Sequence, residues 1–320
     1  MLRFVLGRVA TSILMLVATS AFVFIILRLL PGDPVITRLG ESSTVSQEVI
    51  DQIRRELGLD LPFPLQYWQW LTNAVQGDFG RSFFSQYPVT DLIAGRIEPT
   101  VELAILALIL TIAISLPVAI MSARRPGGLA DRIVQGISSL AMSTPQFLLG
   151  LVLILIFGIG LDLLPTRGFT PIAEGLGENL SRMIMPSLTL ALISAPILIR
   201  FLRASLVEAL SSPYVRTAQG KGVPENRIIT RHVLQNALIP SLTVVGMMVG
   251  GMLGGAVVIE YVFGISGLGS LAIEAVGKRD YAIVQAVTVF ISGLFILTSL
   301  IVDLLYGVLD PRLRVKRSHG

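Results

Sequence analysis

Residues 213–236 read PYVRTAQGKGVPENRIITRHVLQN and form a long polar stretch between two apolar runs. Glu225 is the only acid in this stretch, and its basic residues are Arg216, Lys221, Arg227, Arg231 and His232. The rest of the chain is far more apolar, because 53% of the 320 residues are hydrophobic, only 14% are charged and the mean hydropathy is +0.76. Such a composition is typical of a membrane protein. A long polar stretch between two apolar runs of such a chain indicates a surface that docks against another molecule.

Six charge-free apolar runs are long enough to cross a bilayer, whose hydrocarbon core needs about 20 apolar residues. They are residues 9–27, 103–123, 133–159, 183–199, 237–259 and 281–302. Because lipid offers no partner for backbone polar groups, each run is expected to be a helix. The first run starts like a signal peptide, but it is too long and no small-residue cleavage site follows, so we expect it to be retained. The sequence thus predicts an all-α integral membrane protein, a single transmembrane domain over residues 1–320 with six transmembrane helices and both termini on one side.

The distribution of Lys and Arg gives the orientation, since short loops rich in these residues stay in the cytoplasm. Both termini and the loops 122–132 and 200–236 hold most of the 25 Lys and Arg residues, whereas most of the 21 acids lie in the other loops. Both termini and the 200–236 loop are therefore predicted to be cytoplasmic. This topology explains the net charge of +4 without a nucleic-acid partner.

The loop between the first two spans, residues 31–98, is too long to be a plain connection. Apolar residues at helical spacing from Val49 to Leu57, after a cap at Thr44 or Ser46, predict one helix that Gly58 closes. A second, aromatic-rich helix is predicted to contain Tyr67, Trp68 and Trp70. These aromatic residues fit either an interfacial belt at headgroup depth or a small extracytoplasmic cap that contacts a soluble binding protein, and both can hold together.

The fifth apolar run has a glycine every four residues and two more glycines beside them: Gly246, Gly250, Gly254, Gly251 and Gly255. Small residues at this spacing let two helix backbones approach closely. We interpret the glycines as a packing face, either within this chain or against a second membrane subunit, and favour this over a ligand site. A moving gate is an alternative, because close packing also allows sliding.

The chain lacks the motifs of an enzyme or of a self-powered pump. It contains no cysteine, and Gly220-Lys221 is followed by Gly222 instead of the Ser or Thr of a phosphate-binding loop. No ionisable residue lies inside the six apolar runs, whereas ion-driven carriers usually place carboxylates or histidines at membrane depth. We therefore expect no catalytic residue, metal or cofactor in this chain, and an energy source on another chain.

Within residues 213–236, Pro213 and Pro224 suit the first turns of two short helices. Gly222 breaks the chain between them, and Glu225 lies favourably at the positive end of the second helix. The second helix also has an apolar face formed by Ile228, Ile229 and Val233. An ordinary basic loop needs neither helices nor this length, and a DNA-binding helix-turn-helix is disfavoured because the membrane holds both ends. The pattern favours two short helices that couple this chain to a cytoplasmic partner.

Residues 214–240, YVRTAQGKGVPENRIITRHVLQNALIP, resemble the cytoplasmic coupling loop of ABC-importer permeases of the dipeptide/oligopeptide/nickel class. The EAA…G pattern of that loop falls on Arg216, Thr217, Ala218 and Gly222, with the Glu and first Ala replaced, and Gln235 stands where a later proline is found. Further blocks similar to the family occur in order along the chain: RLLPGDP at 28–34, LGLD at 57–60, GDFGRS at 77–82, EYVF at 260–263, GLG at 267–269, RDY at 279–281 and DLLYGVLDPR at 303–312.

The resemblance implies a type I ABC-importer permease architecture in a bacterial or archaeal cytoplasmic membrane. It implies a second homologous permease subunit, two cytoplasmic ATP-binding subunits or domains that carry ATP and Mg, an extracytoplasmic substrate-binding protein and surrounding membrane lipid as partners. Dipeptides or oligopeptides are the expected cargo; nickel, glutathione or oligosaccharides are alternatives within the class, and an ion-coupled secondary carrier is the alternative outside it. The residues expected to couple to the ATPase are Tyr214, Arg216, Thr217, Ala218, Lys221, Gly222, Glu225, Arg231 and His232.

Overall fold

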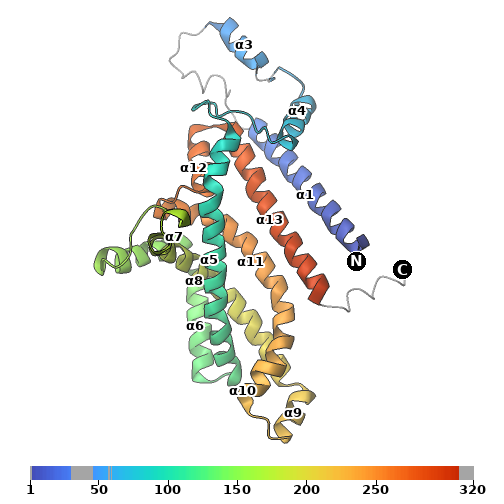
Figure 1. Ribbon diagram of the computed structural model, residues 1–320, viewed down its shortest axis with the longest axis vertical. Coiled ribbons are helices and arrows are strands. Elements are labelled where there is room, and N and C mark those ends of the chain that lie inside the picture. The colour runs from blue at the N-terminus through green and yellow to red at the C-terminus, as the bar shows by residue number, and fades with distance from the viewer. Residues whose placement is uncertain (1, 30–45, 57, 59, 310–320) are drawn as a thin grey trace.

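The computed structural model describes residues 2–29, 46–56, 58 and 60–309, and these form a helical bundle (Figure 1). The long helices are α1 (Leu2–Leu29), α5 (Val89–Arg124), α8 (Leu176–Leu210), α11 (Leu234–Phe263) and α13 (Tyr281–Leu309). The shorter ones are α3 (Gln47–Glu56), α4 (Phe63–Val75), α6 (Leu129–Ser143), α7 (Gln146–Leu153), η1 (Ile154–Gly160), η2 (Ile172–Glu174), α9 (Pro213–Gly220), α10 (Glu225–Ile228), η3 (Ile229–Val233) and α12 (Leu268–Lys278).

Five helices are long and apolar enough to cross a membrane, and they contain five of the six predicted runs. The remaining run, residues 133–159, is not one helix, because α6 and the α7–η1 helix meet at an angle of 105°. Thr144 and Pro145 separate them in extended conformation, with ψ angles of 127° and 135°. A residue before proline is driven out of the helical region, which explains the break. The chain has six spans only if this bent pair counts as one.

The core of the bundle lies where α5, α8 and α11 pack together. Its largest fully buried side chains include Leu103 of α5, Met183 and Leu198 of α8, and Met252 and Phe263 of α11. Helix α1 lies at the edge, packed along α13, and leaves large side chains such as Leu14 and Phe22 exposed (Figure 1). In a membrane protein such an apolar outer face is covered by lipid.

The two ends of the bundle differ (Figure 1). Helices α3 and α4, from the predicted extracytoplasmic insert, lie at one end, and α9 and α10, from the 200–236 loop, lie at the opposite end. Helix α5 already begins at Val89, so the last ten residues of the 31–98 insert are helical and continuous with the second span. Residues 30–45, including the predicted cap at Thr44, lie outside the described part of the chain.

Candidate functional site

The predicted coupling segment forms two helices at the end of the bundle that the charge distribution predicts to be cytoplasmic, called the cytoplasmic end below. Pro213 occupies the first turn of α9, after Ser212 in extended conformation. The chain then turns through Gly222, whose φ angle of +73° lies in the left-handed region that favours glycine. No atom lies within 4 Å of where a Cβ on Gly222 would stand, so backbone conformation alone explains this glycine. Helix α10 starts directly after Pro224.

The segment is seated on the bundle by an apolar face. Ile228, Ile229 and Val233 are buried, which confirms the apolar face predicted for the second helix. Val215 of α9 is buried as well and joins the same core, together with Leu206 of α8. The sequence analysis missed Val215 because it is a single apolar residue among polar ones. Burial of these side chains holds the two helices against the ends of α8 and α11.

Helix α10 does not end before the fifth span. It continues through the π-helical turn η3 into α11, and Ile228, Ile229, Val233 and Leu234 all keep right-handed helical backbone angles. The sequence predicted a separate second helix followed by a span from residue 237, but no Gly or Pro interrupts residues 225–239. Helix α10, η3 and α11 therefore form one continuous helical segment.

The polar residues of the segment face away from the bundle. Tyr214, Arg216, Thr217, Lys221, Gly222, Glu225 and Arg231 are exposed. Ala218 is half-buried and packs against the core, so it supports the helix more than it presents a surface. The side chain of His232 lies outside the described part of the structure. The exposed residues form a mainly basic surface at the cytoplasmic end.

A buried carboxylate that the sequence analysis missed lies beside this surface. Asp131, in the first turn of α6, is only 4% exposed and accepts hydrogen bonds from Nε and Nη2 of Arg203, both at 2.6 Å. It also accepts bonds from the Ser122 hydroxyl of α5 and from the Gly127 amide at 2.7 Å. One carboxylate thus joins α5, α6 and α8. No local sequence pattern reveals it, because Arg203 lies 72 positions away.

The same turn also contacts α10. Arg124, the last residue of α5, donates from Nη2 to the Asn226 side-chain oxygen at 2.8 Å. Its Nε lies 4.0 Å from the Glu225 carboxylate. Glu225 therefore faces an arginine of its own chain as well as the start of α10. From the sequence, Arg124 is only one of the positive charges that indicate the cytoplasmic side.

The glycines of the fifth span divide into two groups. A Cβ on Gly250 would overlap the ring of Phe295, and a Cβ on Gly246 would lie 2.6 Å from Val302, so both glycines let α11 approach α13. A Cβ on Gly255 would approach Gln146 and Leu190. Gly251 and Gly254 are exposed, and nothing lies within 4 Å of a Cβ on either. Only these two leave a smooth helix surface open.

The predicted aromatic residues of the insert have different environments. The Tyr67 hydroxyl lies 2.9 Å from the Ser20 hydroxyl and donates to the Val17 carbonyl, and its ring contacts Phe24, so it fixes α4 to α1. Trp70 stacks on Tyr67. Trp68 is 62% exposed and is the one of the three that presents a large free surface.

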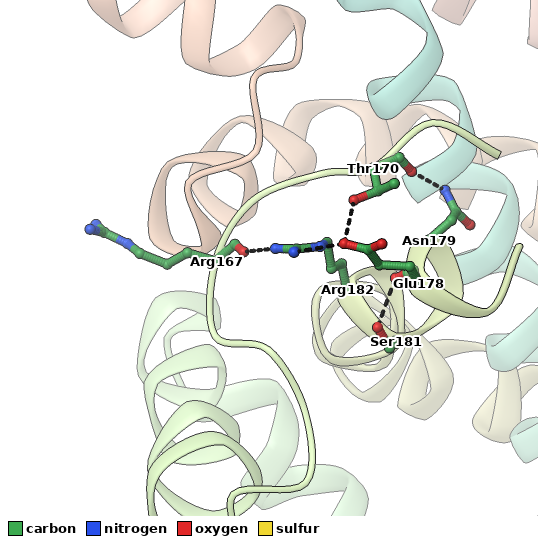
Figure 2. Close-up of polar contacts among 6 residues, drawn as sticks. All are labelled: Arg167, Thr170, Glu178, Asn179, Ser181 and Arg182. Carbon is green, nitrogen blue, oxygen red and sulfur yellow. Dashed lines mark hydrogen bonds and ion pairs between the residues drawn. The ribbon is translucent and has the colours of Figure 1, made fainter. Parts of the chain in front are cut away.

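The extracytoplasmic loop before α8 is held by a second polar cluster (Figure 2). Arg182 donates to the Arg167 carbonyl and to the Glu178 carboxylate, both at 2.9 Å, and Asn179 donates to the Thr170 carbonyl at 2.8 Å. The amide of Gly168 bonds to the carbonyl at the end of α11, at 3.0 Å. Figure 2 shows the side chain of Arg167 pointing away from this cluster. The loop is therefore fixed to α8 and α11, with one exposed cation on it.

Glu102 of α5 and Glu260 of α11 lie within these helices because both helices extend past the predicted runs. Glu102 and Glu260 each lie one residue outside those runs. Glu260 is fully buried and accepts bonds from the Thr100 hydroxyl at 2.6 Å and the Ser270 amide at 2.9 Å, so it caps α12. Glu102 has both carboxylate oxygens shielded from solvent. In the described part of the chain, no group of three or more His, Asp or Glu residues could hold a metal ion.

Two family models of known proteins together match nearly the whole chain. The family model "binding-protein-dependent transport system inner membrane component" matches residues 115–315, and the model of the N-terminal region of such components matches residues 1–104. The chain is 38% identical, over 97% of its length and 99% of the relative, to the probable peptide ABC transporter permease protein y4tP of Sinorhizobium fredii. It is 40% identical, over 99% of its length and 100% of the relative, to the glutathione transport system permease protein GsiC of Escherichia coli K12.

The fold is also similar to a solved structure. A chain from inward-facing conformations of the MetNI methionine ABC transporter superposes with a TM-score of 0.57 at 18% identity, covering 68% of this chain and 96% of that one. This likeness concerns the arrangement of the helices.

Proposed function

Because the chain belongs to the family of binding-protein-dependent transport system inner membrane components, we propose that it is the pore-forming permease subunit of an ATP-driven peptide importer. The observation that carries the proposal is the exposed basic surface of α9 and α10. This surface rests on a buried apolar face and continues without interruption into α11. Such a surface suits a protein that receives force from a cytoplasmic partner and passes it to a membrane span.

Two cytoplasmic ATP-binding subunits or domains are the partner that this surface fits. The chain has no phosphate-binding loop of its own, so ATP and Mg belong on those partners, and this chain is not itself the enzyme. The exposed cations Arg216, Lys221 and Arg231 would bind acidic or polar groups on the ATPase. Val215 and Ile228 keep the two helices in position while the contacts form.

A second, homologous permease would complete the pore. The exposed pair Gly251 and Gly254 supports this, because two backbones can approach closely across such a surface. The other glycines of the repeat already pack inside this chain, which leaves this pair for the partner. On the extracytoplasmic side, Trp68 and Arg167 offer exposed contacts for a substrate-binding protein.

Peptides are the cargo that the comparisons favour. The two relatives are named for peptide and for glutathione transport, and glutathione is itself a small peptide. A path for varied peptides should carry little fixed charge, and the six apolar runs contain none. Within the class, dipeptides and oligopeptides are our first choice and glutathione the second.

The mechanism follows from the connection of the elements. Closure of the ATPase pair on ATP moves α9 and α10, and α10 carries α11 with it because η3 joins them. The bundle is then the two-state element that both ATP and cargo bias, as coupling between distant sites requires. ATP hydrolysis releases the ATPases and returns the pore to its inward-facing state.

Reconstitution tests this function directly. The chain would be purified with its partner permease, ATPases and binding protein, placed in vesicles, and tested for uptake of radiolabelled dialanine and glutathione. Uptake that needs internal ATP supports the proposal. Uptake driven by an ion gradient without ATP would show a secondary carrier instead, and failure of the chain to co-purify with an ATPase would refute the assignment.

A further inference from the structure

We propose that the cytoplasmic turn between α5 and α6, residues 122–131, is a second coupling element that locks α10 to α5, α6 and α8 through Arg124, Asp131 and Arg203. The inference rests on the proposed function, because it concerns how movement of the coupling segment reaches the pore. It adds a route to the pore that is independent of the α10–α11 connection.

Arg124, Asp131 and Arg203, together with their hydrogen-bond partners, form a joint between these helices. The buried half of the joint is centred on Asp131. A buried carboxylate needs a full set of donors, and Asp131 has four: two from Arg203, one from Ser122 and one from the Gly127 amide. The paired contact from the Arg203 guanidinium fixes direction as well as distance, because both bonds must form at once. The joint therefore fixes α8 relative to α5 and α6.

The exposed half of the joint reaches the coupling helices. Arg124 lies two residues after Ser122 and donates to Asn226, in the first turn of α10, at 2.8 Å. On the other side, Arg203 lies one turn before Leu206, which packs in the same core as Val215 of α9. The turn between α5 and α6 thus contacts the coupling segment directly at its second helix.

Movement at this joint would reach an apolar cavity. One turn deeper, α5, α6 and α8 line a cavity of about 510 Å³ with side chains that include Val118, Val134 and Ile199. Because the joint fixes the cytoplasmic ends of these three helices, a displacement of α10 moves the walls of the cavity together. The joint thus ties α5 and α6 to α10 and adds a polar link to the apolar packing of α8.

Two pairs of neighbouring arginines provide matched variants. Arg124→Met removes the bond to Asn226, whereas Arg125→Met removes an exposed arginine for which the structure shows no side-chain partner. Arg203→Met removes the paired contact to Asp131, whereas Arg200→Met removes only a bond to the exposed Ser139. Arg203→Lys keeps the charge without the paired geometry and should give partial recovery.

The first test measures transport in the complete reconstituted complex. Arg124→Met and Arg203→Met should still bind the ATPases and hydrolyse ATP, but dialanine or glutathione taken up per ATP should fall about tenfold. Arg125→Met and Arg200→Met should keep the wild-type ratio. A wild-type ratio in both Arg124→Met and Arg203→Met would overturn the inference, whereas no ATP-driven uptake in the wild type would refute the proposed function.

The second test needs no transport and no partner. Because the chain has no cysteine, cysteines at the exposed positions Arg132 and Thr230 accept spin labels without background. The distance between the labels should be narrowly distributed in the wild type, in Arg125→Met and in Arg200→Met, and broad in Arg124→Met and Arg203→Met. If Arg203→Met does not fold, Arg124→Met decides alone, because Arg124 is exposed and its replacement leaves the buried Asp131 contacts in place. Equal distributions in Arg124→Met and Arg125→Met would show that no joint exists.

Discussion

The two ends of the bundle both use buried carboxylates, but with different partners. At the extracytoplasmic end, Glu260 and Asp280 accept bonds from hydroxyl and backbone amide groups, which fix α12 and the 82–83 segment in place. At the cytoplasmic end, Asp131 binds a guanidinium as well and ties three helices together. The contacts at the outer end fix connecting segments in place. The contacts at the cytoplasmic end fix three helices relative to one another.

The largest effect is expected at the outer end, from Glu260→Ala. This change leaves the Thr100 hydroxyl and the Ser270 amide buried without their acceptor, which should cost about 3 kcal/mol of unfolding free energy. Thermal unfolding of the purified chain in detergent measures it. Glu274→Ala, an exposed acid 3.8 Å from Arg96, is the control and should cost less than about 0.5 kcal/mol. Equal losses would mean that burial of Glu260 contributes nothing.

Asp280→Ala should have the next largest effect. Asp280 is buried and accepts bonds from the Ser82 hydroxyl at 2.6 Å and the Phe83 amide at 3.1 Å, so its loss should cost about 2 kcal/mol. The loss should be local, and limited proteolysis near residue 83 should become faster. Asp60→Ala, at an exposed acid of the same insert, should leave the cleavage rate unchanged. Unchanged cleavage in Asp280→Ala would contradict the anchoring role.

Gly222→Leu, at the cytoplasmic end, should destabilise the protein less than the two changes at the outer end. A side chain at a φ angle of +73° is strained by about 1 kcal/mol, so the turn between α9 and α10 should change shape. We expect ATP hydrolysis to become uncoupled from peptide uptake in reconstituted vesicles. Gly220→Leu is the matched control, because its surroundings are equally open and its φ angle is not left-handed. Normal transport by Gly222→Leu would remove Gly222 from the coupling segment's mechanism.

The smallest effect is expected for single charge reversals on the exposed basic surface. Arg216→Glu, Lys221→Glu or Arg231→Glu should each weaken ATPase binding by about 1 kcal/mol at low salt, and less at physiological salt because exposed charges are screened. Co-purification over a series of salt concentrations measures this. Arg132→Glu lies outside the coupling segment and should have no effect. Binding that is insensitive to all three reversals would place the ATPase contact elsewhere.

Much of this architecture is predictable from sequence, because lipid forces apolar runs into helices and basic loops to one side. The five long spans and the exposed coupling segment fall in this class. The bend in the third run does not. Pro117, Pro186 and Pro196 lie inside unbroken helices, whereas Pro145 separates two, so a proline in an apolar run does not by itself predict a break.

The helices of the candidate site and the apolar face of the second one were predictable from sequence, but the long-range contacts around them were not. Basic residues and helix-starting prolines are local signals, and they correctly predicted exposed helices in residues 213–236, whereas the coupling role of this surface stays a prediction. The Asp131–Arg203 pair joins residues 72 positions apart, and no local pattern contains that distance. The glycine repeat likewise could not be divided into Gly250, which packs on Phe295, and Gly251, which remains open, without the position of α13.

The π-helical turn η3 sets the rotational phase between α10 and α11. A π-helical turn holds one residue more than an α-helical turn, and each residue of an α-helix rotates its neighbours by about 100°. Deleting one residue from Ile229–Val233 would therefore turn the basic surface by roughly a quarter of a circle relative to Gly251 and Gly254. The five residues of η3 thus set the angle about the helix axis between the basic surface and the face of α11 that carries Gly251 and Gly254.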